Sequence, residues 1–114
     1  MPHLVVHHSA SVEVASWLPT LHHALSYQDT IDSRAVKTRS LSFESACVGQ
    51  GNAPFVHLEV RLLQGRRPET LKVIQNALVQ VCQSHLDPVV VLTLEIVLMD
   101  PLLYFKILKT LLLK

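Results

Sequence analysis

The sequence predicts an α+β fold in which two consecutive β-α-β units form one four-stranded sheet with two helices on one face. The elements follow the order strand, helix, strand twice. The two halves also open alike, with HLVV at residues 3–6 and HLEV at residues 57–60, and 114 residues suit one compact domain. Each unit should join parallel strands through a right-handed crossover. We therefore expect one domain over residues 1–114, with a pseudo-repeat at 1–50 and 54–101 and a C-terminal tail at 102–114.

The first half begins with a short apolar strand over residues 2–7, which contains β-branched valines. We expect Ser9 or Ser11 to cap the helix that follows, because apolar side chains then recur at helical spacing. Pro19 lies inside this helical stretch and should either kink the helix or restart it. The alternating residues within 33–48 predict a strand with one wetter face.

The second half opens after the clearest turn of the sequence, GQGN at residues 49–52. Residues 55–63 predict a strand, and Pro68 suits the first turn of the next helix. That helix carries an apolar stripe over residues 71–82. Residues 89–99 predict the strongest strand, which we interpret as apolar on both faces. Because two helices cover only one face of the sheet, the other face should be buried against further copies of the chain.

Composition argues against several classes of function. The net charge is +1 and no run of Lys or Arg stands out, so we expect no nucleic-acid partner. The apolar stretches are too short to span a bilayer, so we expect no membrane partner. Cys47 and Cys82 are too few for a disulfide framework. We interpret both as core residues of a reduced, cytoplasmic protein.

Seven histidines raise the question of a metal site. His7 and His8 would point to opposite faces of a strand. His22 and His23 would point about 100° apart on a helix, so neither pair is a natural chelate. No zinc-type spacing with a third ligand is present. We therefore expect neither a metal nor a cofactor.

Pro2 is the most informative residue for chemistry. Processing generally removes Met1 before a small second residue, and this would leave a secondary amine at the chain start. Burial disfavours the charged form of an amine, so the pKa falls and the neutral amine can act as a general base near pH 7. The alternative is that Met-Pro is only a common way for a chain to begin.

Short motifs recur along the chain in a set order: PHLVV at 2–6, FVHL at 55–58, Gly65-Arg66 before a helix, LEI at 94–96, then Asp100-Pro101 and Phe105-Lys106. Together they resemble the 5-carboxymethyl-2-hydroxymuconate isomerase family of the tautomerase superfamily. The resemblance implies a tautomerase-like fold, a homotrimer and a cofactor-independent isomerase. It also implies that the amine of Pro2, as general base and then acid, moves a proton in a keto–enol, hydroxymuconate-type acid from aromatic-compound catabolism.

Arginines are expected to hold the small carboxylate substrate, because a guanidinium pairs with a carboxylate and positive charge stabilises a dienolate. Arg66 matches the arginine of the family's Gly-Arg motif, and Arg67 is its less favoured neighbour. Arg34 matches the second arginine of an Ile-Arg-Ser-Arg stretch in the family, whereas the first is Asp32 here. Arg39 is a candidate only if its strand brings it inward.

Two departures from the family favour an alternative, a non-catalytic trimeric binding protein that retains the tautomerase fold. The carboxylate of Asp32 would repel a dianionic substrate. The leucine-rich end of the chain replaces a usually polar one and fits an amphipathic helix on a neighbouring subunit. Phe43 and Phe55 are candidates to wall the proline pocket and keep it dry.

Overall fold

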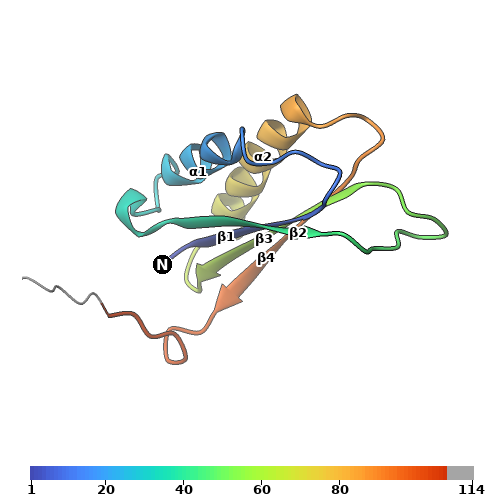
Figure 1. Ribbon diagram of the computed structural model, residues 1–114. Coiled ribbons are helices and arrows are strands. Elements are labelled where there is room, and N and C mark those ends of the chain that lie inside the picture. The colour runs from blue at the N-terminus through green and yellow to red at the C-terminus, as the bar shows by residue number, and fades with distance from the viewer. Residues whose placement is uncertain (108–114) are drawn as a thin grey trace, which may run out of the picture.

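A computed structural model describes residues 1–107 of the chain (Figure 1). The elements are β1 (His3–Ser9), α1 (Leu18–Ser26), the 3-10 turn η1 (Ser33–Ala35), β2 (Lys37–Phe43), β3 (Phe55–Leu63), α2 (Pro68–His85) and β4 (Val91–Met99). The strand order is β2-β1-β3-β4. The pairs β1–β2 and β3–β4 are parallel, and β1–β3 is antiparallel. This arrangement confirms the α+β class with two β-α-β units in one sheet.

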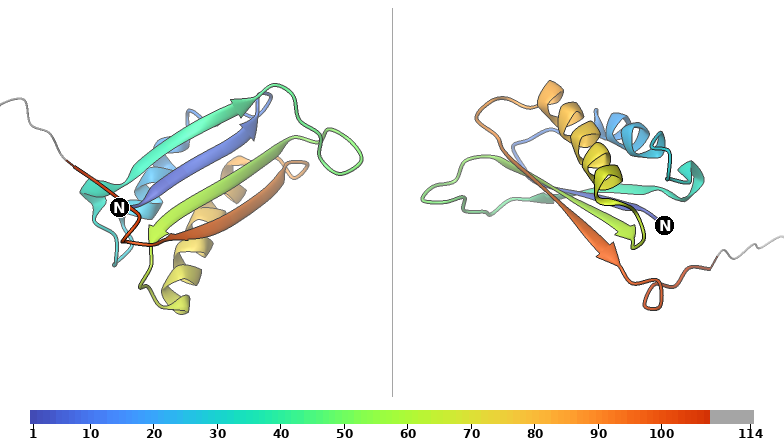
Figure 2. Two further views of the ribbon diagram at one scale, coloured as in Figure 1. Left: turned by 90° about the horizontal axis from the view of Figure 1, so that it is seen from below. Right: turned by 180° about the vertical axis from the view of Figure 1, so that it is seen from behind.

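Both helices pack on the same face of the sheet, as predicted (Figure 2). The strand β3 alternates strictly, and its four residues on the helix side are fully buried. Because only one face of the strand is buried, apolar side chains occupy every second position. The helices bury apolar side chains that recur at helical spacing against this face. The core between the layers includes Val56, Leu58, Val60, Leu62, Leu21, Leu25, Ile74, Leu78 and Cys82.

The helix α1 begins later than the sequence indicates. It starts at Leu18 with Pro19 in its first turn, and no side chain caps it. Capping by Ser9 or Ser11 is therefore wrong, and Pro19 neither kinks nor restarts a helix but lies in the first turn of α1. Proline is favoured there because the first turn has no partner for its missing N–H. The preceding residues form backbone turns, in which the Trp17 N–H donates to the Val14 carbonyl at 3.1 Å.

Two strands are shorter than predicted. Within residues 33–48, β2 covers only Lys37–Phe43, because Asp32 caps the turn η1 by accepting a hydrogen bond from the Arg34 N–H. The strand β4 starts at Val91 and not at residue 89, because the Val90 N–H closes a turn onto the Asp87 carbonyl at 3.1 Å.

The face of the sheet without helices is mixed in character. His57 bonds Glu95 at 2.8 Å and Thr93 at 2.7 Å, and His7 lies 3.2 Å from Glu59. The prediction that β4 is apolar on both faces is therefore wrong at Thr93 and Glu95, which pair with a histidine instead of packing. Burial of this face by other copies stays a prediction.

The two cysteines differ. Cys82 is buried in the core, where burial raises the pKa of its thiol to about 11. Cys47 is exposed in the loop before β3, so its assignment to the core is wrong. Among residues 1–107 no helix is long and apolar enough to cross a membrane. The helix expected at the end of the chain falls almost wholly on residues 108–114, which lie outside the described residues.

Candidate active site at the chain start

The chain start lies at one end of the sheet, where β1 begins (Figure 1). Pro2 is buried, and its carbonyl accepts a hydrogen bond from the Lys37 N–H at 3.0 Å. His3 then pairs with Lys37 on one side and Arg61 on the other. The sheet ladder therefore holds the backbone from Pro2 onward, which gives the group at residue 2 a defined position.

Positive groups surround the terminal amine. Met1 precedes Pro2 here, so the nitrogen of Pro2 is an amide and the amine belongs to Met1. Burial lowers the pKa of this amine below its ordinary value, and the charges of Arg66, Lys37 and Lys106 lower it further. Asp32 acts in the opposite direction. An amine at this place is thus shifted toward its neutral form.

Arg66 is half-buried and held by three hydrogen bonds from its guanidinium. Nε donates to Thr30 Oγ1 at 2.9 Å, Nη2 to the Thr30 carbonyl at 2.9 Å, and Nη1 to the Leu63 carbonyl at 3.1 Å. A guanidinium has five N–H groups, so these bonds leave about two for a ligand. The structure brings Arg66 to the chain start, while its role in substrate binding stays a prediction.

Arg34 and Arg39 take other positions. The side chain of Arg34 is 90% exposed, and its Nε lies 3.3 Å from Asp32 Oδ1. The hydrogen bonds from Arg34 lower the pKa of Asp32. Arg39 lies on the open face of the sheet, where its Nη1 contacts His3 Nδ1 at 3.1 Å. Neither guanidinium is among the charges that shift the pKa of the terminal amine.

Two lysines near the amine were missed by sequence reasoning. The Nζ of Lys37 donates to the Ala35 carbonyl at 3.1 Å, and the Nζ of Lys106 lies 3.4 Å from Met1 Sδ. Lys106 reaches the chain start because the segment after β4 turns back, with the Tyr104 hydroxyl 3.0 Å from His3 Nε2. The Phe-Lys motif pointed to Lys106 without giving it a role, and no local pattern pointed to Lys37.

The sequence profile of 5-carboxymethyl-2-hydroxymuconate isomerase matches residues 2–107. The chain belongs to the 5-carboxymethyl-2-hydroxymuconate isomerase family. This confirms the resemblance seen in the ordered motifs. Membership indicates a tautomerase-type protein for keto–enol isomerisation.

Solved structures share the fold. A 5-carboxymethyl-2-hydroxymuconate delta-isomerase superposes with a TM-score of 0.81 at 17% identity, covering 96% of this chain and 89% of that one. The 5-carboxymethyl-2-hydroxymuconate isomerase of Deinococcus radiodurans R1 gives 0.82 at 20% identity, covering 92% and 87%. A fused 4-OT symmetric trimer gives 0.72 at 13% identity, covering 90% and 91%. No curated protein matches the sequence.

Phe43 and Phe55, which were expected to wall the proline pocket, lie at the end of the sheet opposite Pro2. Phe43 pairs with Ser9 at the far end of β1, and its ring lies 6.2 Å from that of Phe55. Seven strand residues separate this pair from Pro2, which corresponds to about 20 Å. Within one chain, Phe43 and Phe55 therefore do not shield the proline.

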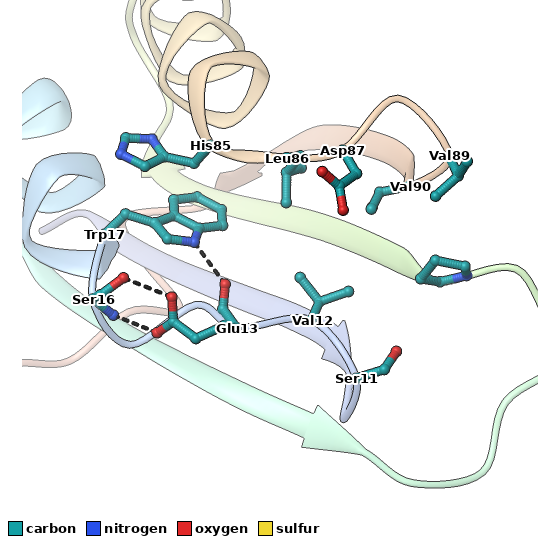
Figure 3. Close-up of a pocket in the computed structure, with 11 residues that line it drawn as sticks. Ser11, Val12, Glu13, Ser16, Trp17, His85, Leu86, Asp87, Val89 and Val90 are labelled. Atoms are coloured by element: carbon teal, nitrogen blue, oxygen red, sulfur yellow. Dashed lines mark hydrogen bonds between the residues drawn. The ribbon is translucent and has the colours of Figure 1, made fainter.

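A cavity of about 380 Å³ lies at this same far end (Figure 3). The Trp17 and His85 rings stack at 5.3 Å on one side of it, and the carboxylates of Glu13 and Asp87 line it without any Lys or Arg. This charge pattern disfavours a carboxylate ligand. Across residues 1–107 no group of three or more His, Cys, Asp or Glu is arranged to hold a metal ion.

Proposed function

We propose that this protein is a cofactor-independent isomerase that moves a proton in a keto–enol, hydroxymuconate-type carboxylic acid, with the amine of Pro2 as general base and then acid. The observation that carries the proposal is a partly buried chain start surrounded by Arg66, Lys37 and Lys106. Removal of Met1 would place the Pro2 nitrogen there as a secondary amine. Family membership supports the reaction class.

The reaction follows from these positions. The neutral amine takes a proton from the carbon next to the carbonyl, and the electron pair moves onto the carbonyl oxygen to give a dienolate. The protonated amine then returns the proton to a conjugated carbon, which restores the carbonyl and the free base. Nearby cations favour the neutral amine before transfer and stabilise the dienolate after it. Arg66 would contribute its remaining N–H groups to the substrate carboxylate.

A homotrimer in the cytoplasm is the proposed active form. Two fused 4-OT structures with this fold are symmetric trimers. The open face of the sheet exposes apolar side chains that a neighbouring copy would cover, including Leu41, Phe43 and Val91. The free thiols suit a reducing compartment. Sedimentation at micromolar concentration should give the mass of three chains, and a monomer mass would contradict the trimer.

The test of the proposed base begins with the intact mass of the purified chain, which should show that Pro2 is the first residue. Ultraviolet absorbance then follows the ketonisation of phenylenolpyruvate or of a 2-hydroxymuconate. Pro2→Ala keeps an amine at the chain start but makes it primary, so we expect a smaller loss. A chain that keeps a residue in front of Pro2 turns the nitrogen into an amide, and we expect its kcat/KM to fall about 100-fold or more, as for the loss of a positioned general base. Activity unchanged in that extended chain rules out the proposed base. A correctly processed, folded trimer with no activity would support the non-catalytic binding protein.

A further inference from the structure

The segment that follows β4 returns to the chain start, as the left view of Figure 2 shows. Two contacts fix this return across more than one hundred residues of sequence: Tyr104 with His3 and Lys106 with Met1. The end of the described chain thus supplies a cation to a site that β1 begins. A hollow of about 360 Å³, lined by Arg61, Gln64, Asp100 and Tyr104 among others, adjoins this return.

Lys106 differs from the other cations in what its charged group contacts. Arg66 spends three N–H groups on Thr30 and Leu63, and Lys37 donates to a backbone carbonyl. The ammonium of Lys106 has a thioether as its hydrogen-bond partner within the described residues, and a thioether is a weak acceptor. That thioether belongs to Met1, the residue whose removal the proposed function requires. Processing would therefore leave this ammonium beside the new amine with its donors available.

The position of Lys106 also bears on the departure at Asp32. The charge of Lys106 acts both on the terminal amine and on the Asp32 carboxylate. Lys106 therefore lies near both the terminal amine and the Asp32 side chain. A cation from the end of the chain can offset the carboxylate that stands at this position.

We propose that Lys106 is a specificity-determining residue that binds the second carboxylate of a dicarboxylate substrate. This inference rests on the proposed function for the position of the reacting end, which Pro2 and Arg66 would hold. A lysine ammonium binds a carboxylate as a point charge without demanding a paired geometry. It therefore selects for a second negative charge on the substrate.

The test compares two six-carbon dienoic acids that differ only in their second carboxylate, trans,trans-muconate and sorbate. Binding to the full chain is measured by calorimetry or by NMR titration, so no turnover is needed. In Lys106→Gln we expect the Kd of muconate to rise about tenfold and that of sorbate to change less than about twofold. Lys106→Arg keeps the charge and should keep most of the preference. Lys72→Gln, an exposed lysine of α2, is the matched control and should change neither Kd.

Each outcome decides the inference. Equal weakening of both acids in Lys106→Gln, no weakening of either, or no preference for muconate in the wild type overturns it. An NMR pH titration of the Pro2 amine gives a second readout, because losing a nearby positive charge should raise its pKa. The proposed base fails separately, through full activity in a chain that keeps a residue in front of Pro2, and that result would leave the muconate preference intact.

Discussion

The two ends of the sheet differ in charge and in how they are held. Where β1 begins, Lys37, Arg66 and Lys106 act on the terminal amine. At the other end, Glu13 and Asp87 line a cavity that contains no Lys or Arg. Like charge repels a carboxylate from the second end and opposite charge attracts it to the first. A cavity alone would have suggested the acidic end, so charge is the better guide to an anionic substrate here.

The acidic end is built for packing. Trp17 is only 3% exposed, stacks on His85, and donates its indole N–H to the Glu13 carbonyl at 2.7 Å. Glu13 is occupied by the backbone and hydroxyl of Ser16 at 2.7 and 2.6 Å. The polar groups of this end thus largely satisfy one another, whereas the hydrogen-bond partner of Lys106 within residues 1–107 is a thioether, a weak acceptor. Substitutions at the acidic end should mainly change the free energy of unfolding, and substitutions at the cationic end should mainly change kcat/KM.

The largest expected effect is on stability, at the acidic end. Trp17→Ala should lower the free energy of unfolding by about 3–5 kcal/mol, because it leaves a core cavity and removes an indole hydrogen bond. Urea denaturation measures this loss, and Trp17→Phe should cost less. Activity per folded molecule should stay near that of the wild type. A Trp17→Ala protein that is folded but inactive would break the division between the two ends.

The next effect is catalytic, at the cationic end. Arg66→Ala should lower kcat/KM by about 100-fold, because it removes the proposed donor to the substrate carboxylate and frees the loop at Thr30. Arg67→Ala is the matched control. Arg67 is 82% exposed and its partner is Glu69 at 3.5 Å, so its loss should change kcat/KM less than about twofold. Similar losses in both variants would show that general charge, and not the position of Arg66, is responsible.

The pH dependence of kcat/KM is a further test of the cationic end. The proposed base is the neutral amine of Pro2, so kcat/KM should fall about tenfold per pH unit below the pKa of that amine. Burial and neighbouring cations lower the pKa of the Met1 amine at this place. The same surroundings should lower the pKa of a Pro2 amine, so the plateau should extend below the range of an ordinary amine. Salt screens the cations and should move the midpoint upward. A flat profile between pH 5 and 8, or a downward shift with salt, would argue against an amine in this field.

The smallest effect concerns Asp32, an acidic group of the described residues that raises the pKa of the terminal amine where the cations lower it. Asp32→Asn should improve muconate binding about two- to threefold, because it removes an exposed negative charge near the site. Asparagine can still accept the hydrogen bond that begins η1. Asp87→Asn makes the same change at the acidic end and should leave Kd unchanged. Equal gains in the two variants would mean that net charge alone governs binding.

Much of the fold could be predicted because a strand or helix that buries one face shows apolar residues at a regular spacing in its sequence. The strand over 55–63 and the stripe over 71–82 each pack one face on the core, so their patterns are visible locally. The ends of β2 could not be predicted in this way. Most residues of β2 are exposed, and its length is set by pairing with β1, from His3 with Lys37 to Ser9 with Phe43.

The candidate site was predictable only where a motif marked it. Pro2 was singled out by its place at the chain start and Arg66 by the family resemblance, and the structure places both near the start of β1. Arg34 pairs locally with Asp32 and is largely exposed, so its role in substrate binding stays a prediction. Lys106 was assigned no role because its contact with Met1 joins residues 105 positions apart. Such proximity depends on the return of the chain after β4 and has no local signature.

The hydrogen bond from Lys37 to the carbonyl of Pro2 has a practical consequence. Pro2 begins the sheet through its carbonyl and supplies the proposed base through its nitrogen. Its carbonyl can therefore be hydrogen-bonded, but its nitrogen must carry no acyl group. Any purification handle or fusion partner joined in front of Pro2 would acylate that nitrogen and yield a well-folded but inert protein. Recombinant material for every assay above should therefore carry its handle after Lys114.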